Sequence, residues 1–314
     1  MSGARPRRQP YLVLALGVFT VAWAAIFIRV AASPPLVTGA YRLTIASLIL
    51  IPAALWRNGE ELRRLSRRDL LLLAASGVFL GLHFATWISS LTYTSVASSV
   101  VLVSTTPLFV GLATHFVFHE RVPPLMFLGI ALATIGGAII GWGDFRASGP
   151  ALWGDLLALV GAVMASAYFL IGRSLRRHLP LLAYVAPTYA VAAAVLIVAL
   201  VLSGQIVLGY PARSYWMFLL LAVGPQVIGH SSLNWALRYL SPTFITVSVL
   251  GEPIGSTILA YVVLQEKPKA LELIGGAVIL AGIYVCSRTE AAAGTPSRRY
   301  SIPLRRGFGG GGLL

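Results

Sequence analysis

Apolar runs of about 20 residues recur along the whole chain, and they restrict the fold more than any other feature. A helix of this length crosses the hydrocarbon layer of a bilayer. Only 11% of the residues are charged, whereas about a quarter of a soluble domain is charged. We therefore predict an all-α integral membrane protein. Ten spans are expected, at residues 11–31, 36–56, 70–91, 96–118, 124–142, 151–172, 181–203, 215–237, 243–264 and 270–287.

Arginine and lysine lie mostly on one side of this ten-span arrangement. They fall in the N-terminus, in the loops after the second, fourth, sixth and eighth spans, and in the C-terminal tail. The other side receives only Arg29, Arg146, Arg213, Lys267 and Lys269. Because positive residues stay in the cytoplasm, both termini are predicted to be cytoplasmic, in a bacterial inner membrane. Topology then accounts for the net charge of +14, and no nucleic-acid partner is expected.

An internal repeat divides the chain. A shift of 146 residues aligns the segment from Leu91 with the segment from Leu237 without a gap. It pairs Leu91 with Leu237, Tyr93 with Tyr239, Pro107 with Pro253, Glu120 with Glu266, Gly129 with Gly275 and Gly136 with Gly282. Earlier in each half, a shift of 144 pairs Gly17 with Gly161 and Arg29 with Arg173. Each copy holds five spans, an odd number, so the second copy enters the membrane inverted, as in many secondary transporters.

The repeat also bears on the first span. Basic residues, an apolar run and Ala31-Ala32-Ser33 are typical of a cleaved signal peptide as well. The apolar run is long for a signal peptide, and it has a counterpart in the second copy. We therefore expect a retained first span.

Each copy has a proline in its fourth span, a glutamate at the end of that span and two glycines in its fifth. This pattern resembles the EamA-type units of the drug/metabolite transporter superfamily. The tandem copies, 11–142 and 151–287, are similar to its ten-span, two-repeat members, which include bacterial exporters of amino acids and other small metabolites. The resemblance implies a central cavity between the halves, alternating access and no cofactor. The basic tail, 288–314, is expected to be disordered and cytoplasmic.

The ninth predicted span contains one charged residue, Glu252. Its first-half counterpart is Thr106, so the repeat itself does not require a carboxylate here. Ser248, Glu252 and Ser256 are four residues apart and would share one helix face. Glu252 either binds a substrate cation or a proton in a cavity, or is protonated or hydrogen-bonded and holds helices together. Ionisable groups inside membranes favour the functional interpretation.

Prolines and glycines mark the expected bends and close contacts. Pro253 frees a backbone carbonyl one turn earlier and should bend the ninth span, and Pro107 is its equivalent in the first copy. Pro225 should act similarly in the eighth span. Gly251 and Gly255 have the spacing of a small-xxx-small packing contact.

The eighth predicted span carries Gln226, His230 and Asn234 at four-residue spacing, just after Pro225. Their first-half equivalents are apolar: Leu80, Phe84 and Ile88. We predict that the three polar residues line a cavity, with helix packing as the alternative. Trp235 would add aromatic surface beside them.

In the third span, His83 and Trp87 are one turn apart and Tyr93 lies near the end. The resemblance places this span near the centre, where His83 would bind a substrate or titrate near neutral pH. The alternative is a neutral histidine bonded to a backbone carbonyl. Arg42, in the second span, has three interpretations. It reaches the outer surface, binds a substrate carboxylate, or pairs with Glu252.

Other polar residues are predicted to be structural. Glu120 and Glu266 each precede a helix start, where a carboxylate satisfies free N–H groups and complements the helix dipole. His115 and His119 have the spacing of two metal ligands but lack a third, so no metal site is expected. The sequence has no Walker loop, HExxH or dinucleotide motif, so neither a cofactor nor ATP hydrolysis is expected.

These features favour a secondary transporter or facilitator that exports small metabolites such as amino acids. Arg42 would bind the substrate carboxylate and Glu252 its ammonium group, with protons as a candidate coupling ion. The chain would act in the bilayer as a monomer or homodimer. A lipid-linked or nucleotide-sugar carrier is the first alternative, although it would need more basic residues inside the membrane. A membrane enzyme built on Glu252, His230 and His83 ranks lower, as does a membrane interaction protein.

Overall fold

The computed structural model describes residues 8–94, 99, 102–119, 122–141, 149–265 and 270–293, and this part of the chain is helical, without strands. The first half contains α1 (Gln9–Ala31), α2 (Pro35–Arg63), α3 (Arg67–Tyr93), α5 (Thr106–Leu112), η1 (Ala113–Val117) and α6 (Pro124–Gly141). The second half contains α7 (Pro150–Arg176), α8 (Leu181–Leu202), α9 (Ala212–Leu221), η3 (Ala222–His230), α10 (Ser231–Ala236), α11 (Pro242–Val249), α12 (Gly251–Leu264) and α13 (Ala270–Ala293). The symbol η denotes a π-helix, whose hydrogen bonds run from i to i+5.

Eight stretches of helix in the described residues are long and apolar enough to cross a membrane. Two shorter apolar helices, Thr106–Val117 and Pro124–Ile139, lie where the fourth and fifth spans were predicted. The predicted fourth span, 96–118, falls partly outside the described residues. The eighth span is built from α9, η3 and α10, and the ninth from α11 and α12. The predicted all-α membrane fold is confirmed.

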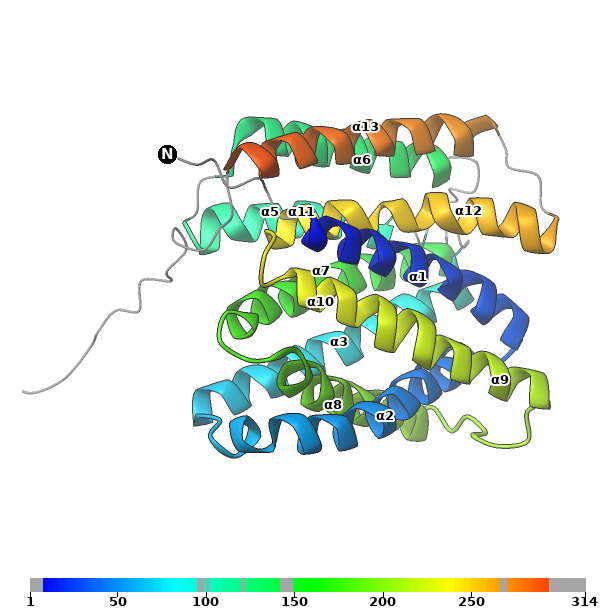
Figure 1. Cartoon of the computed structure of the whole chain (residues 1–314). Coiled ribbons are helices and arrows are strands. Elements are labelled where there is room, and N and C mark those ends of the chain that lie inside the picture. The colour runs from blue at the N-terminus through cyan, green and yellow to red at the C-terminus, as the bar shows by residue number, and fades with distance from the viewer. Residues whose placement is uncertain are drawn as a thin grey trace, which may run out of the picture.

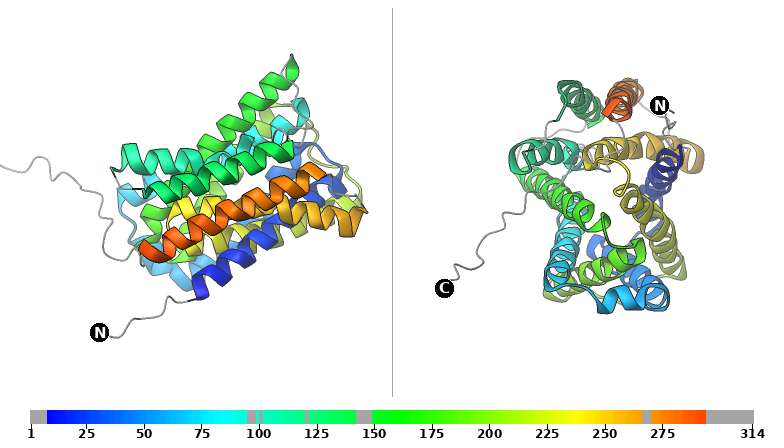
Figure 2. Two further views of the ribbon diagram at one scale, coloured as in Figure 1. Left: turned by 90° about the horizontal axis from the view of Figure 1, so that it is seen from above. Right: turned by 60° about the vertical axis from the view of Figure 1, so that its left-hand side comes forward.

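The helix pairs that pack together in one half recur in the other. α3 packs on α7, and the equivalent pair is α1 with η3 and α10. α5 packs on α7, and the equivalent pair is α12 with α1. α6 lies against its own counterpart α13, and α2 against its counterpart α8, at opposite edges of the molecule (Figures 1 and 2). The two halves are therefore packed against each other, as expected for inverted repeats.

Glycines bring α6 and α13 into direct backbone contact. A Cβ atom on Gly136 would lie 2.6 Å from the carbonyl oxygen of Gly275. A Cβ atom on Gly282 would lie 2.7 Å from the carbonyl oxygen of Gly129. Both contacts are shorter than a side chain tolerates, so the paired glycines of the two repeats set the distance between these helices.

Each half has one interrupted helix, and the interruption falls at the same place. In the second half, α11 ends at Val249 and α12 begins at Gly251, with Leu250 outside both. In the first half, α5 begins at Thr106 after a turn at 104–105. Pro253 and Pro107 follow these breaks directly. Proline has no N–H group and its ring excludes the carbonyl four residues earlier, which explains why both helices break there.

The last helix is longer than its sequence predicted. α13 continues through Ala293, so residues 288–293 belong to a helix and not to the predicted tail. Its buried Glu290 accepts hydrogen bonds from the backbone nitrogen and Oγ of Ser241, at 2.7 and 2.6 Å. These bonds join the end of α13 to the N-terminus of α11. The rest of the predicted tail, from residue 294, lies outside the described residues.

Candidate functional site

A cavity of about 100 Å³ lies between the two helix breaks. Val103, Ser104, Thr106 and Pro107 reach it from the first break, and Val249, Leu250, Glu252 and Pro253 from the second. The remaining wall comes from α1, α2, α3, α7, α10, α11 and η3, and includes Arg42, His83, Phe84, Trp87, Phe169 and His230. Residues of both halves therefore form one site. Interrupted helices that meet at the interface of two repeats are typical of substrate sites in transporters.

Arg42 is a buried charge on the wall of this cavity, with only 2% of its surface exposed. Its Nε donates to Oε1 of Gln226 at 2.8 Å, and its guanidinium carbon stands 4.6 Å from the centre of the Phe84 ring. Its Nη2 atom is buried and has no hydrogen-bond partner. The side chain therefore does not reach the outer surface, which excludes the first of the three interpretations of Arg42.

Glu252 lies in the first turn of α12 and lines the same cavity. In the described part of the chain its carboxylate accepts no hydrogen bond, and no ion pair joins it to Arg42. The two groups nevertheless interact electrostatically. A carboxylate and a guanidinium that share a cavity without closing on each other can bind opposite ends of one ligand.

His83 and Trp87 form one side of the cavity. The Nδ1 atom of His83 lies 3.0 Å from the carbonyl oxygen of Gly161, and a carbonyl can only accept. In a neutral ring this bond leaves Nε2 as an acceptor. The Trp87 ring stacks on His83 at 5.9 Å, and its buried Nε1 has no hydrogen-bond partner. His83 therefore both satisfies a backbone carbonyl and lines the cavity.

His230 enters the cavity from the end of η3. Its ring meets the Phe84 ring edge to face at 5.6 Å, and its Nδ1 atom is buried without a partner. Unpaired buried polar atoms are rare because each costs desolvation energy. Arg42, Trp87 and His230 each contribute one such atom, and all three residues line one cavity.

The predicted stripe of Gln226, His230 and Asn234 is divided by the structure. Gln226 and Asn234 are fully buried and lie outside the cavity wall, and only His230 is part of it. The reason is that residues 222–230 form a π-helix, whose wider turns shift the side chains away from four-residue spacing. Gln226 instead accepts a hydrogen bond from Arg42.

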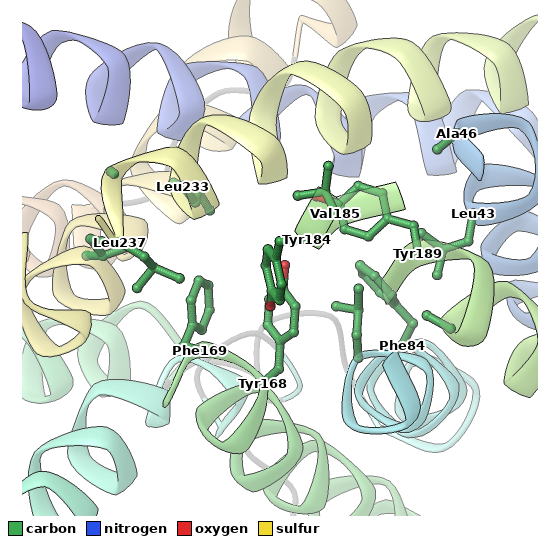
Figure 3. Close-up of a cluster of buried hydrophobic side chains, with 14 of the residues drawn as sticks. Leu43, Ala46, Phe84, Tyr168, Phe169, Tyr184, Val185, Tyr189, Leu233 and Leu237 are labelled. Atoms are coloured by element: carbon green, nitrogen blue, oxygen red, sulfur yellow. The ribbon is translucent and has the colours of Figure 1, made fainter. Parts of the chain in front are cut away.

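Asn234 belongs to a buried network of tyrosines. Its Nδ2 lies 2.5 Å from the Tyr168 hydroxyl, 3.3 Å from the Tyr189 hydroxyl and 2.8 Å from the His230 carbonyl oxygen, and its two N–H groups are shared among these acceptors. In Figure 3, Tyr168 lies between Phe169 on one side and Tyr189 and Phe84 on the other. Phe169, Leu233 and Phe84 line the cavity, so this network lies directly behind its wall.

The predicted face of Ser248, Glu252 and Ser256 is also divided. The Oγ atoms of Ser248 and Ser256 donate to carbonyl oxygens of their own helices, at 2.8 and 3.0 Å, and neither residue lines the cavity. Leu250 breaks the helix between Ser248 and Glu252, so the two no longer follow one helical repeat. Thr246 lines the cavity from α11 instead.

Two predicted aromatic residues lie away from the cavity. Tyr93 ends α3 and is 46% exposed. Trp235 lines a separate outer groove between α1, α8 and α10, and its ring lies 4.5 Å from that of Tyr239. The predicted helix-end residues Glu120 and Glu266 lie outside the described residues.

The predicted packing glycines of α12 face α1. Cβ atoms built on Gly251 and Gly255 would lie 3.1 Å from Val18 Cγ1 and 2.8 Å from Ala22 Cβ. Pro225 lies inside η3, three residues after that π-helix begins at residue 222. None of these three residues lines the cavity.

Several lining residues were not predicted, notably Phe84, Thr106, Phe169 and Thr246. Thr106 could have been predicted from the repeat, because it is the counterpart of Glu252 and equivalent positions of the two halves lie around the same centre. No sequence signal distinguishes the two phenylalanines from those that face lipid. Among the described residues, no group of three His, Cys, Asp or Glu side chains could hold a metal ion.

Comparison with known proteins agrees with this architecture. The EamA-like transporter family model matches residues 9–142 and again residues 152–288. An uncharacterised transporter of Archaeoglobus fulgidus is 26% identical over 90% of this chain and 98% of its own length. A protein of Streptantibioticus cattleyicolor named "probable terminal-alkyne amino-acid exporter" is 28% identical over 91% of this chain and 98% of its own.

The fold has also been seen in a crystal structure. That structure has a TM-score of 0.78 to this one, at 21% identity, and the match covers 91% of this chain and 99% of the other. At this identity the likeness concerns the fold alone. The two family matches together span nearly the whole helical part of the chain, one in each half, and the relatives that they accompany are named transporters. The protein belongs to the EamA-like transporter family.

Proposed function

We propose that this protein is a secondary transporter or facilitator that exports small metabolites, amino acids first among them, by alternating access around the central cavity. The observation that carries the proposal is the pair of opposite charges on that cavity. The Glu252 carboxylate accepts no hydrogen bond within the described residues, and Arg42 has a buried Nη2 without a partner. A zwitterion would satisfy both, with its carboxylate at Arg42 and its ammonium group at Glu252.

The dimensions of the cavity favour a small cargo. Its volume is about 100 Å³, whereas sites for drug-sized ligands occupy about 300–1,000 Å³. Among the described residues, Arg42 is the only arginine or lysine on the cavity wall, and a nucleotide sugar would need more positive groups for its phosphates. The relative from Streptantibioticus cattleyicolor, named as a probable amino-acid exporter, supports the same substrate class.

We place the protein in a bacterial inner membrane with both termini in the cytoplasm. The support is the distribution of arginine and lysine, which gather in alternate loops. With this orientation, the N-terminal ends of α1 and α3 and the C-terminal ends of α7 and α13 face the cytoplasm. Protons are the candidate coupling ion, since Glu252 and two histidines share the cavity.

Counterflow in proteoliposomes tests the proposal. Purified protein is reconstituted with unlabelled amino acids inside, and uptake of labelled amino acids is followed for wild type and Glu252→Gln. We expect saturable exchange by wild type and a loss of at least about 10-fold in the variant, because one charge-assisted hydrogen bond to the cargo is removed.

Glu290→Gln is the matched control. Glu290 is also a buried carboxylate inside a helix, but its oxygens are bonded to Ser241, outside the cavity. This variant should exchange as wild type does. Wild-type liposomes that exchange no amino acid or other small zwitterion would contradict the proposal, and equal loss in both variants would show that any buried carboxylate matters.

A further inference from the structure

Gln226 does not line the cavity, yet it contacts Arg42, an arginine on the cavity wall. It is 0% exposed and does not line the cavity. Its Oε1 accepts the Nε–H of Arg42 at 2.8 Å, across helices that are far apart in the sequence. A residue of the other repeat therefore binds Arg42 from the side that faces away from the cavity.

Packing alone does not require an amide at this position. The counterpart of Gln226 in the first repeat is Leu80, which is also 0% exposed. Gln226 follows Pro225 inside η3, and the wide turn of this π-helix directs it toward α2 and away from the cavity. π-helical turns occur often at functional sites, where they redirect one side chain.

The bond fixes which part of the guanidinium remains free. Gln226 accepts the hydrogen bond of Arg42 Nε. Phe84 covers one face of the guanidinium, with its ring centre 4.6 Å from the guanidinium carbon. Nη2 is left without a partner. A guanidinium held in this way offers its terminal nitrogens as a fork, which matches the two oxygens of a carboxylate. Without the Nε bond, the long side chain would have several rotamers and no fixed fork.

We propose that Gln226 is a positioning residue that orients Arg42 as the carboxylate-binding group of the site, so that the cargo must carry a carboxylate. The inference rests on the proposed function and narrows its substrate class. Glu252 then selects the cationic end of the same cargo. Amines and amides that lack the carboxylate would be poor substrates.

The test compares a transported amino acid with its carboxamide as competitors in the counterflow assay. In wild type, we expect the amino acid to compete at least about 10-fold better than its carboxamide, since the amide cannot form the charged fork. Gln226→Leu, which installs the first-repeat residue, should raise KM about 10-fold with a smaller change in maximal rate, and should reduce the preference toward unity.

Thr188→Val is the control for a change of buried polarity. Thr188 is 0% exposed, and its Oγ1 has no hydrogen-bond partner, so the substitution removes a buried hydroxyl without touching Arg42. The preference for the carboxylate should be unchanged. If Gln226→Leu does not fold, Gln226→Asn is used, because its shorter side chain cannot reach Nε.

The outcomes separate the two proposals. Wild-type exchange with a carboxylate preference that Gln226→Leu and Gln226→Asn leave intact would overturn the positioning role and keep the transporter. Wild-type exchange that treats the amino acid and its carboxamide alike would overturn the carboxylate requirement. Absence of any exchange by wild type would contradict the proposed function itself.

Discussion

Thr106 and Glu252 occupy equivalent positions at the two helix breaks, and both line the cavity, but their side chains are used differently. The Thr106 hydroxyl donates to the Val103 carbonyl oxygen at 2.7 Å, one turn earlier. Pro107 removes the N–H that would otherwise bond this carbonyl, so Thr106 repairs the break within its own helix. An ionised Glu252 has no proton to donate, and its carboxylate remains free for a ligand.

The same contrast extends along the two repeats. The helix pairs, the breaks and the glycine contacts recur in both halves, whereas the polar side chains do not. In the second repeat, this stretch carries the polar residues Gln226, His230 and Asn234. The equivalent positions of the first repeat hold the apolar residues Leu80, Phe84 and Ile88. The packing of the fold is therefore shared by both repeats, whereas the polar groups differ between them: Arg42 and His83 of the cavity come from the first repeat, and His230 and Glu252 come from the second. Three predictions test this division.

The largest effect is expected when the carboxylate is moved between the repeats. Glu252→Thr should lower amino-acid exchange at least about 10-fold, because the cationic end of the cargo loses its charged partner. Adding Thr106→Glu to this variant should not restore exchange, since the carboxylate would then lie at the other break. Exchange and thermal unfolding are measured for both variants. Recovery by the double variant would show that either repeat can carry the charge.

A smaller effect is expected when a methyl group is added at the glycines between α6 and α13. The loss of stability should be equal in the two repeats. Gly136→Ala and Gly282→Ala each place a methyl group within 2.7 Å of backbone across the α6–α13 interface. Each should lower the free energy of unfolding by about 1–3 kcal/mol, measured by denaturation in detergent. Gly137→Ala is the control, because a Cβ atom there meets nothing within 4 Å. Unequal losses at Gly136 and Gly282 would contradict the symmetry of packing.

The smallest effect is expected in the tyrosine network of the second repeat. Tyr168→Phe removes only the hydroxyl that Asn234 contacts at 2.5 Å. The free energy of unfolding should fall by about 0.6 kcal/mol, the average for hydrogen bonds between membrane helices. Tyr261→Phe, at a position that is 49% exposed, should leave it unchanged. A stabilised Tyr168→Phe protein would show that the network serves function at the expense of stability.

The amino-acid pattern was sufficient to predict the membrane fold, the repeat and the positions of the helix breaks. These features depend on patterns that are local or strictly periodic: apolar runs, prolines, and glycines at a fixed shift. Arg42, His83, Trp87, His230 and Glu252 were also predicted for the site and line the cavity. Polar residues inside the membrane are few, so burial energy restricts them to the protein interior.

Which of the remaining polar residues face the cavity could not be predicted from the sequence, because it depends on the backbone geometry of the folded helices. Four-residue spacing predicts a shared face only where the helix is regular, and both predicted stripes cross irregular backbone. The π-helix at 222–230 turns Gln226 toward Arg42, and the break at Leu250 separates Ser248 from Glu252. The hydrogen bond between Gln226 and Arg42 joins the two repeats, and no pattern within either repeat encodes it. It exists because inverted packing of the halves brings α2 beside η3.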